Sequence, residues 1–577
     1  MDTHLEHQHH TLAHLLAAAV LELYPEAKRT IGPAIENGFY YDFGDLKIAD
    51  EDLPKIEDKM RDLLPSWTDM AGKDISPADA RTLFADNPYK LELIDEYEKD
   101  GLTTYTSGSY TDLCRGGHTE NPAKEIKPDS FKLTHLAGAY WRGSEKNAML
   151  TRIYGVAFAT KKELEEYLTM LEEAKKRDHK VLGPQLDLFV FSDLVGAGLP
   201  LWTPRGTIMR DLLDGFVWQL RHQRGYARVE IPHITKRELY ETSGHWDKYK
   251  DDLFKIKTRE GHDFAMKPMN CPHHTQIYAR KLWSYRELPQ RYASTTMVYR
   301  DEQSGELAGL SRVRSITQDD AHVFCRMSQV KDEALKIWDI VHEFYGAFGI
   351  PLRVRLSLRD SATPEKYLGG AERWDAAESM LREIVDDKKV EAEDGTGEAA
   401  FYGPKLDFMG RDAIGREHQV ATIQLDMNMP ERFDLTCVNE EGQKERIVMI
   451  HAAIMGSIER FLALAIEHFA GAFPVWLAPV QIAVLPISEK HVEEARKVTD
   501  YLKTLGLRVE LHDQNESFGK KIRNAELMKI PYLFVMGDKE IEAKKIAVRQ
   551  RGKGDLGMQD PVEFIARIQE EIKTKML

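Results

Sequence analysis

The sequence has 577 residues and a formal net charge of −15 at pH 7, with 79 Lys and Arg against 94 Asp and Glu. Hydrophobic residues make up 42% and charged residues 30%, which is typical of a globular protein and excludes a disordered chain. The acidic balance excludes indiscriminate coating of polyanions, although local basic patches remain possible. Four cysteines are too few to cross-link a chain of this length, so we expect free thiols or metal ligands in a reducing compartment, and a cytoplasmic protein.

The first 180 residues predict a compact α+β domain followed by a connecting helix. Apolar residues recur at helical spacing from Leu12 to Leu23, and an aromatic strand follows at 39–41. Helical patterns are found at 50–64 and 76–99, and short strands alternate with glycine turns over 103–158. The stretch 160–180 is rich in charged helix formers and predicts an exposed helix. We therefore expect a domain over 1–158 and a linker helix over 159–180.

The rest of the chain predicts one large and one small domain. Residues 181–475 show no clean break, and glycine turns, β-rich runs and helices alternate there. Amphipathic helices are expected at 206–224, 330–348 and 451–469. Strands and helices alternate over 476–577, which is typical of a small α/β domain with a mostly parallel sheet.

One segment needs to be tested as a membrane span. Residues 469–488 carry no charge, and about 20 such residues could cross a bilayer. Three prolines in the segment would break a spanning helix. We therefore expect a helix end, a turn and a buried strand, and no membrane partner.

Two elements of the first domain could form one polar site. His10 and His14 are four residues apart, which places both imidazoles on one face of a helix. The second element, YTDLCRGGH, carries Asp112, Cys114 and His118. One thiol and three imidazoles could bind zinc, or they could form a wet pocket that holds a water against an ester. A surface histidine cluster is the simpler interpretation of the histidines alone.

The large domain carries three further candidates. Residues 299–324 favour two strands joined by a glycine loop, which would project Arg300, Glu302 and Arg312 on one surface. Guanidinium groups bind phosphates through paired hydrogen bonds, and a carboxylate can accept from an adenine amine. The run GSIER begins an apolar helix and is a weak polyphosphate signal. Composition alone favours Cys271, in KPMNCP, as a buried structural thiol.

These motifs together resemble those of class II aminoacyl-tRNA synthetases. TxxVYRDEQSGELAGLSRVRSITQDDAHVF resembles motif 2, GSIERFLAL resembles motif 3, and VEIPHI, with Pro232, resembles the end of motif 1, which forms the dimer interface in that class. A resemblance to threonyl-tRNA synthetases in particular rests on KPMNCP, TQDDAHVF and MIHAAIMGSIER, and it extends from His10 to the C-terminus. It implies a homodimer that ligates L-threonine to tRNA(Thr) through a threonyl-adenylate, with ATP converted to AMP and diphosphate.

The resemblance also implies the fold and the nucleotide site. The α+β multidomain chain would hold an α+β editing domain over 1–158, an antiparallel-sheet catalytic core over 181–475 and an α/β anticodon-binding domain over 476–577. ATP would bend against motif 2, with Mg²⁺ at its phosphates. Arg300 would bind the α-phosphate, Glu302 the adenine, and Arg312 with Arg460 the γ-phosphate, so that the three arginines are the catalytic candidates. Further ATP contacts are implied for Gln419, Thr422 and Ser457.

In the amino-acid site, Cys271, His322 and His451 match the family's zinc ligands, which replaces the plain-thiol interpretation. Three protein ligands would leave one Zn²⁺ per chain an open position, where threonine could bind through its amine and hydroxyl. Valine has the same shape without the hydroxyl and would leave a position unfilled. The residues implied around the amino acid are Met269, Gln318, Asp320, Tyr402 and Gln424.

Serine has the hydroxyl and lacks only a methyl group, a difference of about 1–3 kcal/mol, so the family implies hydrolysis of seryl-tRNA(Thr) in a second site. The residues that match this editing pocket, which we expect to hold no metal, are His10, His14, Lys90, Asp112, Cys114 and His118. The residues that match the family's anticodon contacts are Asn515, Arg523, Glu540 and Arg549.

The sequence departs from the family in a few places. The editing helix begins almost at Met1, so we expect a small ubiquitin-like domain to be absent, and Gly117, Val420, Ala421 and Ala452 stand where other residues are common. Two other interpretations stay open: a non-catalytic paralogue that senses tRNA, and a synthetase for a different amino acid. The presence of the motif 2 and motif 3 arginines argues against the first, and the three metal ligands argue against the second.

Overall fold

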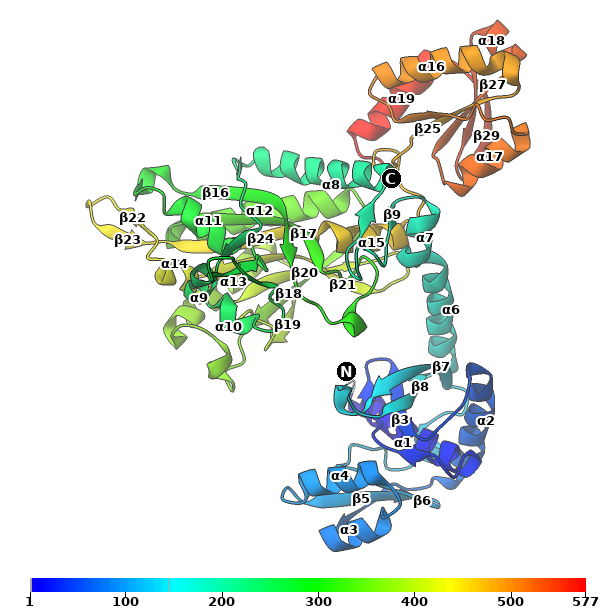
Figure 1. Ribbon diagram of the computed structural model, residues 1–577, viewed down its shortest axis with the longest axis vertical. Coiled ribbons are helices and arrows are strands. Elements are labelled where there is room, and N and C mark those ends of the chain that lie inside the picture. Colours follow the sequence, from blue (N-terminus) through cyan, green and yellow to red (C-terminus); the bar gives the residue numbers. More distant parts are fainter. Residues whose placement is uncertain (1–2, 145) are drawn as a thin grey trace. The chain divides into compact units, whose positions relative to one another are not determined.

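The structure is a computed structural model that describes residues 3–144 and 146–577 (Figure 1). Its contacts divide the chain into two compact units, Met1–Glu172 and Glu173–Leu577. The division falls inside helix α6 (Lys161–Arg177), in which Leu164 is the one buried residue. This is the exposed helix that the charge pattern of 160–180 predicts.

The first unit packs helix α1 (Thr3–Leu23) against an antiparallel sheet. The sheet has the order β1-β3-β8-β7, with β2 beside β3. Its strands are β1 (Lys28–Arg29), β2 (Ala34–Ile35), β3 (Gly38–Gly44), β7 (Phe131–Tyr140) and β8 (Met149–Ala157). Apolar side chains of α1 at helical spacing, such as Leu12 and Leu16, meet Phe39 and Phe43 of β3 in one core.

A smaller layer completes the first unit and contributes to its polar site. Strands β4 (Ala71–Ile75), β5 (Leu102–Ser107) and β6 (Tyr110–Leu113) form a second antiparallel sheet. The helices of the unit after α1 are α2 (Leu53–Leu63), α3 (Pro77–Leu83), α4 (Pro88–Tyr97) and α5 (Pro122–Glu125). The long helical pattern of 76–99 is therefore two helices, each with a proline at its first position, where the missing N–H costs no hydrogen bond.

An eight-stranded sheet forms the centre of the second unit, with the order β11-β16-β17-β24-β21-β20-β18-β19. Its strands are β11 (Ala227–Arg228), β16 (Gln290–Tyr299), β17 (Ser315–Cys325), β18 (Leu352–Leu358), β19 (Ala392–Thr396), β20 (Lys405–Arg411), β21 (Glu417–Asp426) and β24 (Val448–Ser457). The six inner strands, from β16 to β18, pair antiparallel. Helices α8 (Pro204–His222), α12 (Val330–Gly346), α13 (Ala371–Lys388) and α15 (Ile458–His468) contribute to its core. The predicted antiparallel-sheet core is confirmed.

The register of the central strands brings polar residues to one face. Because side chains alternate along a strand, Gln318, Asp320 and His322 of β17 share a face, and Asp319 points the other way. His322 lies directly opposite His451 of β24, which lies opposite Gln424 of β21. On the reverse face the Asp319 carboxylate contacts Arg221 of α8 at 3.2 Å.

The predicted helix over 451–469 is wrong in its first half. Strand β24 continues to Ser457, and helix α15 begins only at Ile458. Residues 448–455 are all buried, since this strand lies in the middle of the sheet. A short apolar run of this kind cannot be assigned to strand or helix from periodicity alone.

The small C-terminal domain has the sheet order β26-β25-β27-β28-β29, in which the first three strands are parallel and the last two antiparallel. The strands are β25 (Ile482–Pro486), β26 (Val509–Leu511), β27 (Tyr532–Met536), β28 (Ile546–Gln550) and β29 (Gly554–Gln559). The helices are α16 (Val492–Thr504), α17 (Phe518–Leu527), α18 (Asp538–Ala543) and α19 (Pro561–Lys573). The α/β prediction is confirmed, but the sheet is mixed and not mostly parallel, since only the two pairings that β25 makes are parallel.

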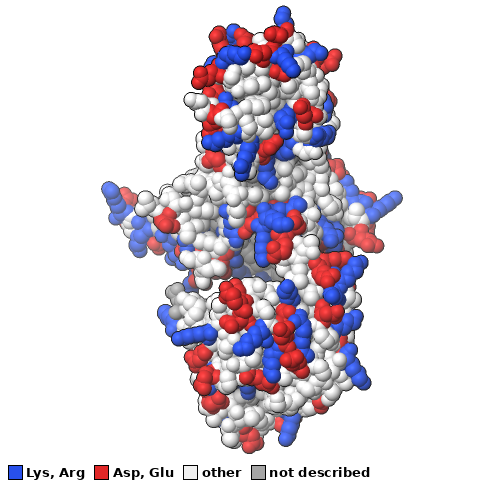
Figure 2. Space-filling model, turned by 90° about the vertical axis from the view of Figure 1, so that its right-hand side faces the viewer, with Lys and Arg blue, Asp and Glu red and all other residues white. Residues whose placement is uncertain are grey.

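Two further observations concern the surface. Over the part of the chain that the structure describes, no helix is both long and apolar enough to cross a membrane. On the face shown in Figure 2, Lys and Arg side chains are interspersed with Asp and Glu. Such a mixed face does not form the extended basic surface that binds polyanions without specificity.

Candidate functional site

A cavity of about 830 Å³ lies against the central strands of the eight-stranded sheet. All the residues expected around ATP line this cavity: Arg300, Glu302, Arg312, Gln419, Thr422, Ser457 and Arg460. They come from the β16–β17 connection, from strand β21 and from the start of helix α15. Residues more than 150 positions apart in the sequence are thus brought together, as the resemblance predicts.

The cavity presents polar groups that have no protein partner. Arg300 Nε and Thr422 Oγ1 are buried, and neither has a hydrogen-bond partner among the described residues. A buried polar atom without a partner costs about 1–3 kcal/mol, so both atoms are suited to contact a ligand. Arg312 donates to Glu302 at 2.7 Å, and this hydrogen bond raises the pKa of the guanidinium. The cavity therefore combines several guanidinium groups with the carboxylates of Glu302 and Glu467.

The start of helix α15 is fixed beside the same cavity. Ser457 Oγ accepts from the Arg460 N–H at 3.2 Å and so caps the helix. Glu459 accepts from both the backbone and the hydroxyl of Thr317 at 2.7 Å, which ties the helix to strand β17. Gly456 precedes them at a φ of 72°, a conformation that favours glycine.

A thiol and two imidazoles meet at one point beside the sheet. Cys271 begins helix α11 (Cys271–Tyr278), and its ligand atom lies within 4.8 Å of those of His322 and His451. His322 Nε2 lies 3.1 Å from His451 Nδ1. All three side chains are buried. The structure thus brings together the three residues that the resemblance implies as metal ligands, from stretches 180 residues apart.

The donor set fits a zinc ion. Two nitrogens bound to one tetrahedral zinc at about 2.0–2.1 Å lie roughly 3.3 Å apart, close to the separation of the two imidazole nitrogens. Burial lowers the pKa of His322 well below its ordinary value, so the imidazole is neutral, as a metal ligand must be. Burial also raises the pKa of the Cys271 thiol, and a bound cation would reverse that effect.

Two residues that the sequence did not indicate orient these imidazoles. His451 Nε2 donates to Asp426 Oδ2 at 3.0 Å, which leaves the lone pair of Nδ1 free toward His322. His322 Nδ1 lies 2.7 Å from His274 Nδ1, and His274 Nε2 contacts Ser294 at 3.1 Å. Hydrogen bonds of this kind fix the tautomer and ring orientation of metal-binding histidines. The alternation of β21 could have indicated Asp426, because it shares a face with Gln424.

The residues expected around threonine surround the buried triad. Tyr402 donates to Gln424 at 3.0 Å, and its ring lies 5.1 Å from that of His451. Asp320 Oδ1 lies 3.7 Å from His322 Nε2, and burial raises the pKa of this carboxyl to about 6. Met269 connects the triad to the nucleotide cavity, because its sulfur accepts from Arg300 at 3.3 Å. Gln318, the last of these residues, lines the cavity itself.

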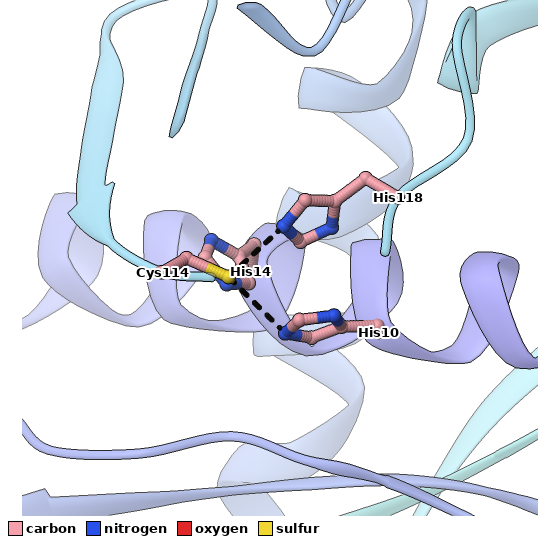
Figure 3. A group of neighbouring side chains, drawn as sticks. All are labelled: His10, His14, Cys114 and His118. Atoms are coloured by element: carbon pink, nitrogen blue, oxygen red, sulfur yellow. Dashed lines mark hydrogen bonds between the residues drawn. The ribbon is translucent and has the colours of Figure 1, made fainter. Parts of the chain in front are cut away.

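The first unit holds the second polar cluster, which Figure 3 shows. His10 and His14 project from α1, and Cys114 and His118 follow strand β6. Cys114 Sγ lies 3.2 Å from His118 Nε2 and 3.5 Å from His10 Nε2. The rings of His10 and His118 stack with their centroids 4.2 Å apart. Burial lowers the pKa of His14 to about 3 and that of His118 to about 2, so both imidazoles are neutral at pH 7.

A buried ion pair lies next to this cluster. Lys90 Nζ contacts Asp112 Oδ1 at 2.7 Å, and both side chains are buried. Asp112 also accepts from the hydroxyls of Tyr41 at 2.5 Å and Tyr110 at 2.9 Å. Burial acts to raise the pKa of Asp112, but Lys90 and Arg29 outweigh it and hold the pKa well below its usual range. The carboxylate therefore stays ionised, and the sequence had indicated neither tyrosine nor Arg29.

The four residues expected at the anticodon have different surroundings in the small domain. Asn515 is exposed just before α17, and Arg523 is exposed on it. Arg549 of β28 lies 3.6 Å from Glu526 of α17, so three of the four residues lie on α17 or beside it. Glu540 is buried, and its carboxylate accepts from the Gly537 N–H at 2.9 Å where α18 begins. This contact gives Glu540 a structural task in the unbound protein.

Three segments match known protein families. Residues 254–469 match the family described as tRNA synthetase class II core domain (G, H, P, S and T). Residues 481–571 match the anticodon binding domain. Residues 102–154 match the threonyl and alanyl tRNA synthetase second additional domain.

Whole-chain similarity is also extensive. The threonine–tRNA ligase of Porphyromonas gingivalis is 50% identical over 571 residues, which cover 98% of this chain and 87% of that protein. That of Bacteroides fragilis is 50% identical over 573 residues, which cover 98% and 88%. The crystal structure of the RNA binding domain of threonyl-tRNA synthetase from Cryptosporidium parvum is 37% identical with a TM-score of 0.65, and the match covers 68% of this chain and 98% of that one.

Proposed function

The chain belongs to the threonine–tRNA ligase family, and on that premise we propose how its side chains divide the family reaction. The enzyme activates threonine with ATP to a threonyl-adenylate, passes the acyl group to the 3′ end of tRNA(Thr), and removes serine in the first unit. The observation that carries the proposal is the meeting of Cys271, His322 and His451 beside a cavity whose lining includes the three candidate arginines Arg300, Arg312 and Arg460.

Activation takes place at the border of the cavity and the buried triad. The threonine carboxylate attacks the α-phosphorus, the bond to the bridging oxygen breaks, and diphosphate leaves. Arg300, whose Nη2 reaches Met269 and whose Nε has no protein partner, stabilises the negative charge that builds on the α-phosphate. Arg312 and Arg460 bind the γ-phosphate, Glu302 accepts from adenine, and Gln419, Thr422 and Ser457 complete the contacts. Mg²⁺ accompanies the phosphates, as in the family.

Selection of threonine depends on Cys271, His322 and His451, which hold one Zn²⁺ per chain. When bound, the ion supplies a Lewis-acid position for the amine and hydroxyl of threonine. Asp320 accepts the hydroxyl proton, and Gln318, Met269, Tyr402 and Gln424 enclose the rest of the amino acid. Valine cannot fill the hydroxyl position, so the buried polar groups around it reject valine strongly, whereas serine is rejected only weakly.

Removal of serine takes place at the cluster of the first unit. His10, His14, Cys114 and His118 hold a water against the seryl ester, and a neutral imidazole can take its proton. Water oxygen bonds to the ester carbon, the ester bond breaks, and the proton passes to the ribose oxygen. Asp112, saturated by hydrogen bonds, holds the Lys90 ammonium in place to stabilise the negative charge on the carbonyl oxygen.

Binding partners complete the proposal. Asn515, Arg523, Glu540 and Arg549 contact the anticodon. Several apolar side chains are exposed over 190–201, where Leu194 is 100% exposed, and Ile234, the last residue of VEIPHI, is also exposed. Such a patch suits a subunit interface, which supports a homodimer through the catalytic domain. We assign editing to 1–158, the linker to 159–180, catalysis to 181–475 and anticodon binding to 476–577, in a cytoplasmic enzyme.

Pyrophosphate exchange with individual amino acids tests this function. We expect exchange with threonine, weaker exchange with serine and none with valine, and hydrolysis of seryl-tRNA(Thr) that Cys114→Ala abolishes while exchange is retained. No exchange with any amino acid would support a non-catalytic tRNA-binding paralogue. Exchange with another amino acid but not with threonine would support a synthetase of different specificity.

A further inference from the structure

His179 is a buried residue of the nucleotide cavity to which the activation reaction above gives no task. It is the first residue of helix α7 (His179–Gln185), which Asp178 separates from the connecting helix α6. Asp178 caps α7 by accepting from the Lys180 N–H, which fixes the start of the helix. The imidazole is therefore held on a rigid element and not on a loose linker.

Both nitrogens of His179 have defined partners. Nε2 lies 3.0 Å from the Leu310 backbone N, and Nδ1 lies 2.6 Å from Glu467 Oε1. A backbone N–H can only donate, so Nε2 must be the acceptor and Nδ1 must carry the proton. That proton is donated to Glu467, which also accepts from Arg416. The two contacts thus require one tautomer, and each supports the other.

The Leu310 contact fixes the turn that carries Arg312. Within this turn the Ser311 N–H donates to Ala308 O at 3.0 Å, and the Ala308 N–H donates to Arg312 O at 3.2 Å. Leu310 itself is buried in the main core of the unit. Gly309 has a φ of 55°, and a Cβ there would lie 2.4 Å from His179 Nε2. The imidazole therefore occupies the space that the glycine leaves and closes the turn against α7.

We propose that His179 is a positioning residue for the nucleotide: by accepting the Leu310 N–H, it holds the turn that directs Arg312 into the cavity. The connecting segment is then part of the ATP site through His179, the second residue after α6. This inference rests on the proposed role of Arg312 toward ATP.

Three substitutions separate the two hydrogen bonds. His179→Gln places a carbonyl oxygen near the position of Nε2 and can still accept from Leu310, whereas His179→Asn places an amide near Nδ1 and can donate only to Glu467. His179→Ala removes both. In pyrophosphate exchange we expect His179→Ala and His179→Asn to raise the KM for ATP roughly fivefold to tenfold with little change in the KM for threonine, and His179→Gln to rescue most of that loss.

The outcome has clear alternatives. Equal effects of the Asn and Gln variants, or a parallel rise in both KM values with a fall in melting temperature, would overturn the inference and leave a purely structural histidine. Arg312→Ala serves as the reference. An unchanged KM for ATP in that variant would refute the proposed role of Arg312 toward the nucleotide, whereas the His179 variants test only how the turn is held. Hydrogen exchange of the Leu310 amide, faster in His179→Asn and protected in His179→Gln, gives a readout independent of activity.

Discussion

Replacement of Asp426 by Asn tests whether an outer carboxylate sets the metal affinity of the triad. Asp426 Oδ2 accepts from His451 Nε2 at 3.0 Å, and Oδ1 accepts from the N–H groups of Asn428 and Met429. Asn keeps Oδ1 for the two backbone groups, so helix α14 (Asn428–Arg432) should still begin at the same residue. Its amide nitrogen, however, can only donate toward His451. The imidazole then carries its proton on Nδ1, where the metal should bind.

The size of the effect follows from the burial of this contact. Asp426 has no exposed surface, so water cannot replace the lost acceptor. Loss of such a partner typically weakens metal affinity 10–100-fold, or about 1.4–2.7 kcal/mol. We expect the upper half of that range, because the amide also stabilises the wrong tautomer.

Competition with a chromophoric chelator under anaerobic, metal-buffered conditions measures the zinc affinity. Asp394→Asn is the matched control, because this exposed carboxylate of the same domain accepts from the N–H and the hydroxyl of Thr396 and lies outside the triad. An affinity of Asp426→Asn equal to that of wild type would refute the argument from orientation. A wild-type chain that binds no zinc would instead refute the metal site itself.

Four further changes test other parts of the molecule. Elemental analysis should find about one zinc per chain in wild type and in Cys437→Ala, and none in Cys271→Ala; retention of the metal would exclude that ligand set. Arg460→Ala should raise the KM for ATP in pyrophosphate exchange roughly tenfold or more, since a charge-assisted bond is lost, and an unchanged KM would contradict this. Lys90→Met should lower the free energy of unfolding in chemical denaturation by roughly 3 kcal/mol, because the buried Asp112 carboxylate loses its closest charged partner; a stability equal to that of wild type would contradict this. His14 titrates at about 3 when folded and near 6.5 when unfolded, so its contribution to stability is complete above pH 6.5 and declines as the pH falls toward 3. Between pH 7 and pH 5 this amounts to about 2 kcal/mol, which denaturation of wild type beside His14→Gln should show as a steeper loss for wild type.

Patterns in the sequence were sufficient to predict an α+β first domain and an α/β last domain, whereas the antiparallel sheet of 181–475 was expected only from the resemblance. They failed at 451–457, where a central strand buried on both faces carries no alternation. Neither helix α18 nor strand β29 had a separate signal in the sequence, because each is six residues long and without a strong apolar pattern. Short elements of this kind are defined by their neighbours in the folded domain.

The candidate sites, too, could be predicted only in part from the sequence. Spacing alone could not connect Cys271 with His451, and only resemblance to a family placed them in one site, where the structure brings them together. Asp426 and His274 were not found, since an orienting residue has no motif of its own and is visible only through strand register. Glu540 shows that resemblance can also miss a structural contact. This residue matches a position that binds the anticodon in the family, and its carboxylate also caps helix α18 in the unbound protein.

Strand β17 has a consequence for the tolerance of this protein to insertions. Its adjacent residues Asp319 and Asp320 point to opposite faces, so a register shift that brings Asp319 to the place of Asp320 would still offer a carboxylate to the amino acid. The same shift would place the methyl group of Ala321 where the imidazole of His322 now stands. Such a register shift would therefore keep a carboxylate in the site but remove a metal ligand. Metal binding, and not the position of the carboxylate, thus depends on the correct register of this strand.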